Sequence, residues 1–427
     1  MEVVVLFGTF VVLLLIGVPV AFVLGIASLA TIMYMGLPPL VVFQRMAAGM
    51  NVFALMAIPF FIYAGDLMLR GAIAEKLVRF ASAVIGHLRG GLGLVNVLSS
   101  TFFGGVSGSA VADAAAVGGL MVPQMQKRGY GVDYAVNVTV VSSIIALLIP
   151  PSHNMIIYSI SAGGTISISA LFTAGIVPGF LLAVLLMITA YVVARRRGYP
   201  AEPFPGWTAL VTIFFAALPG LLLAAIIVGG VRSGIFTATE SSTIAVLYSL
   251  LITLVVYRSL SWTEFVHATL GAVRTTAMVL LVIGTASAFG WLLALLQIPA
   301  AMIQVMGQIS DSPIVVFLLI NVMLLVLGCF MDMAPLILIT TPIFLPVVTQ
   351  FGMDPVHFGI VLVLNLGIGL CTPPVGSVLF VGCAVGKIPI TTAVRTIWPF
   401  YIAAFATLLL VTYVPAVSLG LGRLFGE

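Results

Sequence analysis

Phe103-Gly104-Gly105-Val106-Ser107-Gly108-Ser109-Ala110-Val111-Ala112-Asp113-Ala114-Ala115-Ala116-Val117-Gly118-Gly119 is the stretch on which the fold depends. It lies in a strongly apolar chain, yet it contains a carboxylate, two hydroxyls and five glycines. Glycines permit unusual backbone angles, so a helix that ends here leaves carbonyls and amides free to meet a ligand. Close packing through small residues explains the glycines and alanines, but not Asp113, because an acid near mid-membrane is costly. We interpret the stretch as a functional hairpin tip.

The composition excludes a water-soluble protein. Of 427 residues, 62% are hydrophobic and only 7% are charged, and the mean hydropathy is +1.31. These values predict an all-α polytopic membrane protein that lies in a lipid bilayer as one membrane domain. The formal net charge of +4 is small, and the basic residues lie in short connections such as Arg195 to Arg197. Such residues set topology, so a nucleic-acid partner is not expected.

Two smaller features follow from composition. Met1-Glu2 and the apolar run after it lack the basic region of a signal peptide, so we expect the first helix to be retained. Cys329, Cys371 and Cys383 have no metal-ligand spacing, so we expect them to be small apolar fillers.

The first half of the chain is predicted to be one structural repeat, residues 1–197. Residues 92–126 are too rich in glycine for one clean span, and they are expected to form a re-entrant hairpin. Residues 133–165 are apolar but are interrupted by Ile149-Pro150-Pro151-Ser152. Because two prolines remove backbone donors, this segment is predicted to be a broken helix.

The second half, residues 231–427, shows the same order. A second hairpin is expected at 313–349, and a second broken helix at 355–385, interrupted at Thr372-Pro373-Pro374. Residues 198–230 are predicted to be a polar, Pro-rich linker followed by a helix that inverts the topology.

The halves align by landmarks that lie 221 to 223 positions apart: Pro123 with Pro346, Gly131-x-Asp133 with Gly352-x-Asp354, Pro150-Pro151 with Pro373-Pro374, Gly164 with Gly386, and Pro178 with Pro399. Other apolar segments are expected near 3–34, 52–69, 170–194, 207–230, 236–257, 276–297 and 390–416, with amphipathic helices at 70–89 and 300–310.

Charge predicts the orientation. The basic residues expected on the cytoplasmic side are Arg89, Lys127, Arg128, Arg195 to Arg197, Arg258, Arg274, Lys387 and Arg395. Three other arginines, Arg45, Arg232 and Arg423, are then expected on the outer side of the membrane. The helix at 207–230 turns the second half over, so the two halves are an inverted-topology repeat, and such repeats with discontinuous helices are the architecture of secondary transporters.

A hairpin tip that faces an unwound helix supplies neutral oxygens, which suit Na⁺. Repeat symmetry predicts two Na⁺ sites. The residues expected at the first site are Ser107, Gly108, Ala110, Ile149 and Ser152. Those expected at the second site are Gly328, Gly369, Thr372 and Val375. Isolated prolines often only kink packed helices, but two matching breaks beside two matching hairpins favour ion sites.

Asp113 and Asp332 could carry protons, bind an ion or cap a hairpin helix. We favour a structural role close to the sites, because a carboxylate accepts hydrogen bonds from free amides at a helix start. His153 and Asn154 follow the first break and are candidates to touch substrate or to relay a proton, although a lone histidine is more often a hydrogen-bonded core residue. Glu240 either caps its helix or has a functional role.

Catalysis has no support in the sequence. No Ser-His-Asp order, metal-ligand cluster or phosphate loop appears, and the four histidines are scattered. We therefore expect no catalytic residue and no organic cofactor.

Taken together, several motifs resemble the large membrane subunit of the TRAP (tripartite ATP-independent periplasmic) transporters over nearly the whole chain. They are Gly105 to Asp113, Ile149 to Ser152, Gly234 to Glu240, Phe330-Met331-Asp332 with Pro342, and Leu370 to Gly376. Ala238 stands where this family is expected to have proline, and His153-Asn154 stand where apolar residues are commoner.

The resemblance implies a Na⁺-coupled importer in a bacterial inner membrane, working by an elevator mechanism. A periplasmic binding protein would deliver an organic acid such as a C4-dicarboxylate, a sialic or sugar acid, or a 2-oxo acid. A small four-helix membrane subunit would brace the chain. The hairpins contain no arginine, so hydroxyls and free amides would bind the acid. The candidate substrate residues are Ser107, Ser109, His153, Asn154, Thr372 and Ser377.

Two alternatives stay open at this point. A stand-alone Na⁺/dicarboxylate symporter of similar architecture would need no binding protein. A membrane-embedded hydrolase would use Asp113 and Asp332 as a dyad.

Overall fold

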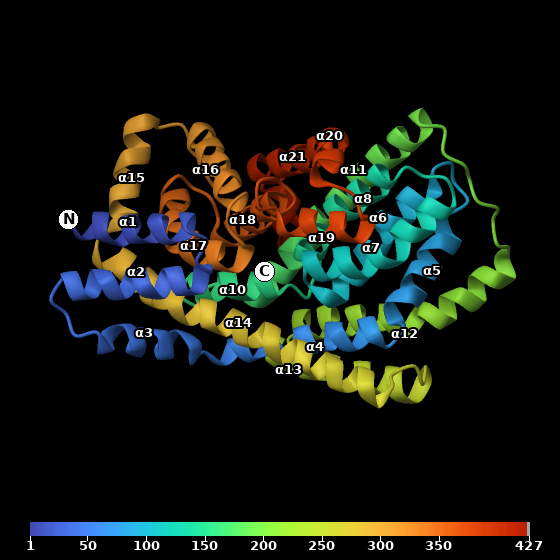
Figure 1. Ribbon diagram of the computed structural model, residues 1–427, viewed down its shortest axis with the longest axis horizontal. Helices are drawn as coiled ribbons and strands as arrows, with labels where there is room; N and C mark the ends of the chain where they lie inside the picture. The colour runs from blue at the N-terminus through green and yellow to red at the C-terminus, as the bar shows by residue number, and fades with distance from the viewer. Residues whose placement is uncertain (425–427) are drawn as a thin grey trace.

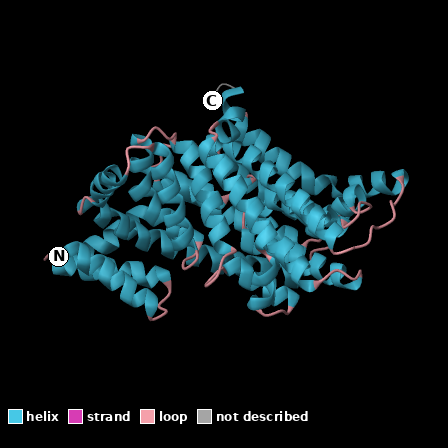
Figure 2. Ribbon diagram, turned by 90° about the horizontal axis from the view of Figure 1, so that it is seen from above, coloured by secondary structure: helices cyan, strands magenta, loops and turns pink. Residues whose placement is uncertain are grey.

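A computed structural model describes residues 1–424, and in this part of the chain every regular element is a helix (Figure 2). The molecule is elongated, with the N-terminus at one end of its long axis (Figure 1). The first half contains α1 (Glu2–Leu15), α2 (Val20–Tyr34), α3 (Leu40–Met50), η1 (Phe53–Met56), α4 (Ala57–Arg70), α5 (Ile73–Ile85), α6 (Gly91–Ser107), α7 (Ala110–Lys127), α8 (Val132–Ser142), α9 (Ile145–Leu148), α10 (His153–Ser161) and α11 (Ile168–Arg196).

A polar connection at 197–206 leads into the second half. It contains α12 (Trp207–Arg232), α13 (Ala238–Leu251), the π-helical turn η2 (Ile252–Val256), α14 (Trp262–Leu295), α15 (Ile298–Ile309), α16 (Pro313–Gly328), α17 (Met333–Gln350), α18 (Pro355–Leu370), α19 (Ser377–Gly386), α20 (Ile390–Thr396), α21 (Trp398–Tyr413) and α22 (Ala416–Leu424).

Six of the described helices are long and apolar enough to cross a membrane, and the number rises to nine if each bent helix pair is one span. The bent pairs turn by 51° at 149–152, by 106° between α19 and α20, and by 57° between α21 and α22. Such a set of helices makes this a multi-pass membrane protein.

The helices form an inner group and an outer group. The outer group includes α3, α4, α13 and α14, which run along the lower long side in Figure 1, and the inner group includes α6, α7, α8, α20 and α21, which lie above them toward the right. Helix α14 packs against α2, α3 and α4, and α12 packs against α5. Many side chains of the outer helices are large, apolar and exposed, as expected for surfaces that face lipid or another membrane subunit.

The structure corrects three expected boundaries. The apolar segment at 3–34 is two helices, because Gly17 has a φ of +86° and Pro19 lacks an amide hydrogen. The segment expected at 276–297 begins at Trp262, since Ser261 and Glu264 form a capping box there. Helix α3 was not expected at all.

Candidate functional site

The tip of the first helix pair is built by Gly108 and Ser109. Gly108 ends α6 with a φ of +58°, and its amide donates to the Gly104 carbonyl at 3.1 Å. Ser109 begins α7, and its Oγ accepts from the Ala112 amide at 3.4 Å. A Cβ on Gly108 would lie 2.4 Å from the carbonyl oxygen of Pro151. The tip therefore touches the first break backbone to backbone, and only glycine fits.

The first break, residues 149–152, interrupts the helix next to the first tip. Helix α9 ends at Leu148, Ile149 is extended, and the Pro150–Pro151 peptide is cis. Ser152 is also extended and precedes α10 without capping it. The hydroxyls of Ser107 and Ser152 are buried, and neither has a hydrogen-bond partner in the described protein. Two such hydroxyls fit the neutral oxygen donors that Na⁺ prefers.

The second tip and break meet in the same manner. The Val375 amide donates to the Cys329 carbonyl at 3.0 Å, which joins the break to the tip. A Cβ on Gly369 would lie 2.7 Å from the Gly328 Cα. The Thr372 hydroxyl donates to the Ile368 carbonyl at 2.8 Å. The Pro373–Pro374 peptide is cis, like that of the first break.

The remaining candidates for substrate contact lie at helix starts. Ser377 begins α19, and its Oγ has no hydrogen-bond partner in the described protein. His153 and Asn154 begin α10; the first is half-buried and the second is buried. Ser109 is half-buried at the first tip. The structure thus brings Ser107, Ser109 and Ser152 to one tip-and-break contact, and Thr372 and Ser377 to the other.

The two carboxylates do not cap as expected. Asp113 is fully buried in α7, and its carboxylate does not cap the helix, because Ser109 holds the cap position. Asp332 occupies the cap position of α17 without a side-chain cap bond, and it is exposed. One buried and one exposed carboxylate give no support to a catalytic dyad. Within residues 1–424, no group of three or more His, Cys, Asp or Glu side chains could hold a metal ion.

Glu240 has a structural explanation. Its carboxylate accepts from the Thr237 amide at 2.8 Å, while the Thr237 hydroxyl accepts from the Glu240 amide at 3.2 Å. This reciprocal pair is a capping box at the start of α13.

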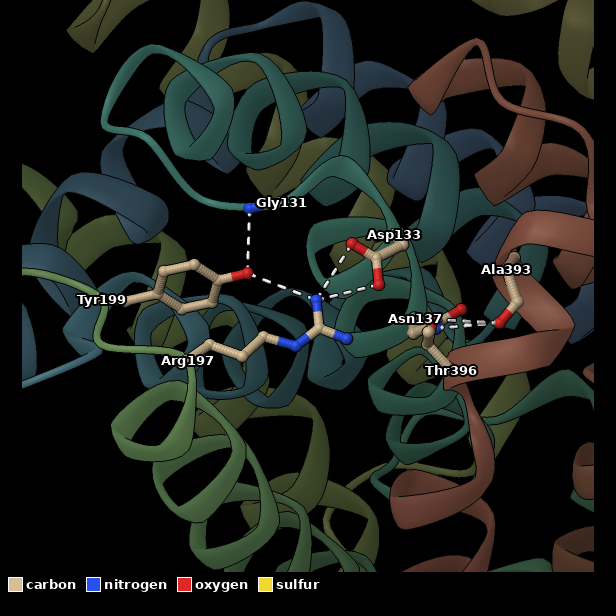
Figure 3. A network of polar contacts seen from close by, with 7 residues as sticks. All are labelled: Gly131, Asp133, Asn137, Arg197, Tyr199, Ala393 and Thr396. Carbon is tan, nitrogen blue, oxygen red and sulfur yellow. Dashed lines mark hydrogen bonds and ion pairs between the residues drawn. The ribbon is translucent and has the colours of Figure 1, made fainter.

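A polar network at the start of α8 was not predicted (Figure 3). Arg197 Nη1 lies 2.8 Å from a carboxylate oxygen of Asp133 and 3.3 Å from the Tyr199 hydroxyl, which accepts from the Gly131 amide at 3.0 Å. Further along α8, Asn137 donates to the Ala393 carbonyl at 3.0 Å. Gly131-x-Asp133 was visible in the sequence only as a repeat landmark.

Further hydrogen bonds hold the connection between the halves, which follows α11, against the inner helices. Pro200 O accepts from the Gly90 amide at 3.2 Å and from the Tyr130 hydroxyl at 3.1 Å. Burial raises the pKa of Tyr130, so its phenol stays a hydrogen-bond donor at neutral pH. Glu202 pairs with Arg128 at 3.2 Å. We call residues 197–202 the strap.

Contacts also cross between the two halves close to the breaks. The Tyr158 hydroxyl donates to the Pro355 carbonyl at 2.6 Å, and a Cβ on Gly367 would lie 3.0 Å from Ile144. Within the second half, Asn365, which no sequence motif indicated, donates to the Asn321 side chain at 2.7 Å and so joins α18 to α16. The two broken helices therefore pack against each other inside the protein.

Residues 7–417 match one protein family, described as the DctM component of the tripartite ATP-independent periplasmic transporters. The uncharacterized protein YgiK of Salmonella typhimurium is 44% identical over 427 residues, covering 99% of this chain and 98% of YgiK. The C4-dicarboxylate TRAP transporter large permease protein DctM of Rhodobacter capsulatus is 36% identical, with full coverage of both chains. The sialic acid TRAP transporter large permease protein SiaM of Vibrio cholerae is 39% identical, covering 97% of this chain and 96% of SiaM.

The fold also resembles a solved transporter. The crystal structure of the YdaH transporter of Alcanivorax borkumensis superposes with a TM-score of 0.64, covering 93% of this chain and 90% of that chain. The sequences are 14% identical, so the likeness concerns the fold alone.

Proposed function

Because the chain belongs to the tripartite ATP-independent periplasmic transporter family as its DctM component, we propose that it is the transport subunit of a Na⁺-coupled importer in a bacterial inner membrane. Its cargo is an organic acid that a periplasmic binding protein delivers. A small four-helix membrane subunit braces the outer helices. In this role the chain moves its cargo without changing it chemically.

The observation that carries the proposal is the pair of tip-and-break contacts. Gly108 meets Pro151 in the first half, and Gly328 meets Gly369 in the second. Equivalent contacts in two halves support an inverted-topology repeat, with two re-entrant hairpins (α6–α7 and α16–α17) and two broken helices (α8–α10 and α18–α19). Discontinuous helices whose ends meet are the usual binding element of secondary transporters.

The first Na⁺ site would use the Ser107 and Ser152 hydroxyls and the backbone at Gly108, Ala110 and Ile149. The second would use the backbone at Gly328, Gly369 and Val375 with the Thr372 hydroxyl. Bound Na⁺ would supply positive charge beside the cargo. The protein contributes the oxygens, holds the two tips against the breaks and shields the site from lipid.

The same division of helices supports an elevator mechanism. The hairpins and broken helices would move together as a transport domain, while outer helices such as α4, α12 and α14 stay as the scaffold. Contacts between these groups involve small side chains: a Cβ on Gly65 of α4 would lie 3.5 Å from the Ser107 Cα. Small residues at such an interface allow backbones to approach and slide.

The cargo would be bound without arginine. Relatives named for C4-dicarboxylate, for sialic acid and for 2,3-diketo-L-gulonate are all 36% to 39% identical to the chain, which supports an organic acid. The hydroxyls of Ser109 and Ser377, with His153 and Asn154, are placed at helix starts where amides favour an anion, while Thr372 lies just beyond the end of α18. The named relatives give no support to a stand-alone symporter.

Thermal stability in the presence of Na⁺ tests the proposal. The purified full chain is heated with increasing NaCl, replaced by KCl or choline chloride at constant ionic strength. A ligand that binds only the folded state stabilises it by RT ln(1 + [L]/Kd), so two weak sites should give a resolvable rise in Tm. We expect a Na⁺-selective rise that Ser107→Ala and Thr372→Ala each reduce.

Ser99→Ala is the matched control. Ser99 lies on the same helix as Ser107, and its hydroxyl is also buried without a hydrogen-bond partner in the described protein. Eight residues separate the two serines, about 12 Å along an α-helix. Ser99→Ala should leave the Na⁺ response intact. Equal stabilisation by Na⁺, K⁺ and choline would refute Na⁺ coupling.

A further inference from the structure

A groove on the outer surface lies between α3 and α14 and has a volume of about 560 Å³. The residues that line it are Leu37, Val41, Gln44, Arg45, Ala48, Trp291 and Leu295. Most of this wall is apolar, but Arg45 and Gln44 add two polar side chains, both exposed. The groove is remote in sequence from both tips and both breaks. It therefore combines a surface for a hydrocarbon chain with donors for a polar group.

Arg45 is held in place by an aromatic ring. Its guanidinium carbon lies 4.7 Å from the centroid of the Trp291 ring, a cation–π contact. No ion pair of Arg45 occurs among residues 1–424. When the flat face of a guanidinium lies against an aromatic ring, its N–H groups point outward along the edge of the guanidinium. There they can donate to the oxygens of a phosphate. The Trp291 ring therefore holds the Arg45 side chain in place, and no acidic side chain among residues 1–424 neutralises its charge.

The height of the groove along α14 also fits a membrane interface. Residues 275–290 of α14 contain no charged side chain, and Arg274 and Trp291 bound this stretch. The 17 residues from Arg274 to Trp291 rise about 25 Å, close to the thickness of a hydrocarbon core. Trp291 and Arg45 therefore lie near the level of the lipid headgroups, where tryptophan and arginine are enriched. Arg274 lies near the opposite interface.

We propose that this groove is a specific binding site for an anionic phospholipid. The phosphate lies against the edge of the Arg45 guanidinium, with the Gln44 amide as a second donor. One acyl chain follows the apolar wall formed by Leu37, Val41, Ala48 and Leu295. The lipid holds α3 against α14. No covalent step is involved.

The apolar wall favours a lipid over a soluble phosphate. A free anion would use Arg45 and Gln44 but would leave the wall exposed, whereas an acyl chain covers the wall as well. The neighbouring outward side chains, Leu40 and Phe43, are 62% and 58% exposed, as expected for a helix in contact with lipid. Charge complementarity then selects an anionic headgroup over a zwitterionic one.

Lipid titration of the purified full chain in detergent tests the proposal. Phosphatidylglycerol or phosphatidylcholine with the same acyl chains is added, and bound lipid is counted by native mass spectrometry while Tm is measured. We expect phosphatidylglycerol to bind more tightly and to raise Tm more. Arg45→Ala should weaken phosphatidylglycerol binding about five-fold, the effect of one cation near a membrane surface. Phosphatidylcholine binding should be unchanged by the substitution.

Arg274→Ala is the matched control, because it removes the same charge from an exposed position on α14. It should leave phosphatidylglycerol binding unchanged. Arg45→Lys keeps the charge but loses the planar edge, so we expect an intermediate affinity. Glycerol phosphate, which has the headgroup chemistry without acyl chains, should neither bind detectably nor raise Tm. Equal binding of both lipids, or an Arg45→Ala variant with unchanged lipid preference, would overturn the proposal.

Discussion

Gly369 leaves no room for a methyl group. A Cβ at this position would lie 2.7 Å from the Gly328 Cα and 3.0 Å from its carbonyl oxygen, and backbone atoms cannot swing aside. Gly369→Ala should therefore separate the second tip from the second break. We expect a loss of about 1–3 kcal/mol of stability, the usual cost of overpacking, together with a weaker Na⁺ response. Thermal unfolding with and without Na⁺ measures both effects.

Gly119→Ala provides the comparison. Nothing lies within 4 Å of a Cβ at Gly119, which is inside α7. Alanine should stabilise a helix interior there by about 0.5–1 kcal/mol and leave the Na⁺ response unchanged. If Gly369→Ala behaves like Gly119→Ala, the close contact does not form the second site.

At the residue scale, the sequence predicted which residues lie at the tips and breaks better than it predicted their hydrogen bonds. Ser107 and Ser152 were selected because they flank a glycine tip and a proline break, and the structure places those two elements in contact. Asp113 does not cap α7, because Ser109, four residues nearer the helix start, is the N-cap residue and its hydroxyl already accepts from the Ala112 amide. Sequence spacing cannot decide which of two polar residues near the start of a helix is the cap.

At the scale of elements, breaks were easier to predict than helix starts. Pro150-Pro151 and Pro373-Pro374 cannot continue a hydrogen-bond ladder, so both interruptions could be placed from sequence. The apolar segment expected from 276 begins at Trp262 in the structure, because the first turns of α14 carry polar side chains such as His267 and Arg274. In the structure, the capping box of Ser261 and Glu264 begins the helix and the polar side chains follow its surface.

The capping box of α13 should affect the stability of the protein but not its response to Na⁺. Thr237→Ala removes the hydroxyl that accepts from the Glu240 amide and should cost about 1 kcal/mol. Thr243→Ala on the same helix removes only a bond to the Thr239 carbonyl and should cost less. Thermal unfolding compares the two. Both variants should keep the full Na⁺ response, and a lost response in Thr237→Ala would show that the start of α13 reports on the ion sites.

The ion pair that begins the strap, Asp133 with Arg197, should contribute more to the free energy of unfolding than an ordinary surface ion pair. Asp133 and Arg197 side chains are 20% and 32% exposed, whereas those of Glu75 and Arg79 are 48% and 70% exposed. Asp133→Ala also leaves Arg197 with Tyr199 as its remaining partner in the network of Figure 3. We expect Asp133→Ala to cost about 1 kcal/mol and Glu75→Ala about 0.3–0.5 kcal/mol. Equal shifts in Tm would mean that the strap adds no stability.

At the scale of the whole molecule, the sequence predicted an all-helical membrane transporter, and the fold and the family membership agree with it. The repeat landmarks located the helix pairs and breaks but not the contacts between the halves. Tyr158 with Pro355 and Asn137 with Ala393 are examples, because they join residues that no local pattern relates. The sequence predicted the strap only as part of a polar, Pro-rich linker, because no local pattern indicated its bonds to Gly90, Tyr130 and Asp133.

A disulfide between hairpin and scaffold tests whether the two groups move. A Cβ on Gly105 of α6 would lie 3.5 Å from the Ala224 Cβ of α12, within the range that disulfides need. In a chain whose three native cysteines are replaced by serine, Gly105→Cys with Ala224→Cys should crosslink on oxidation. We expect Na⁺-driven uptake in proteoliposomes containing the partner subunits to stop, and reduction to restore it.

Val140→Cys with Gly382→Cys is the corresponding crosslink inside the proposed transport domain. A Cβ on Gly382 of α19 would lie 3.7 Å from the Val140 Cβ of α8. This disulfide should leave uptake intact, because both helices would move together. Full uptake through an oxidised Gly105–Ala224 crosslink would contradict the elevator.

The strap has a consequence for how the halves depend on their peptide connection. Because it is bonded to Gly90, Tyr130 and Asp133, only residues 203–206 remain between it and the first turn of α12. Meanwhile Asn137 holds Ala393 and Tyr158 holds Pro355 across the halves. The covalent link at 203–206 therefore contributes little to holding the molecule together. Two separately synthesised fragments, divided there, carry on their own surfaces the contacts needed to recognise each other and reassemble.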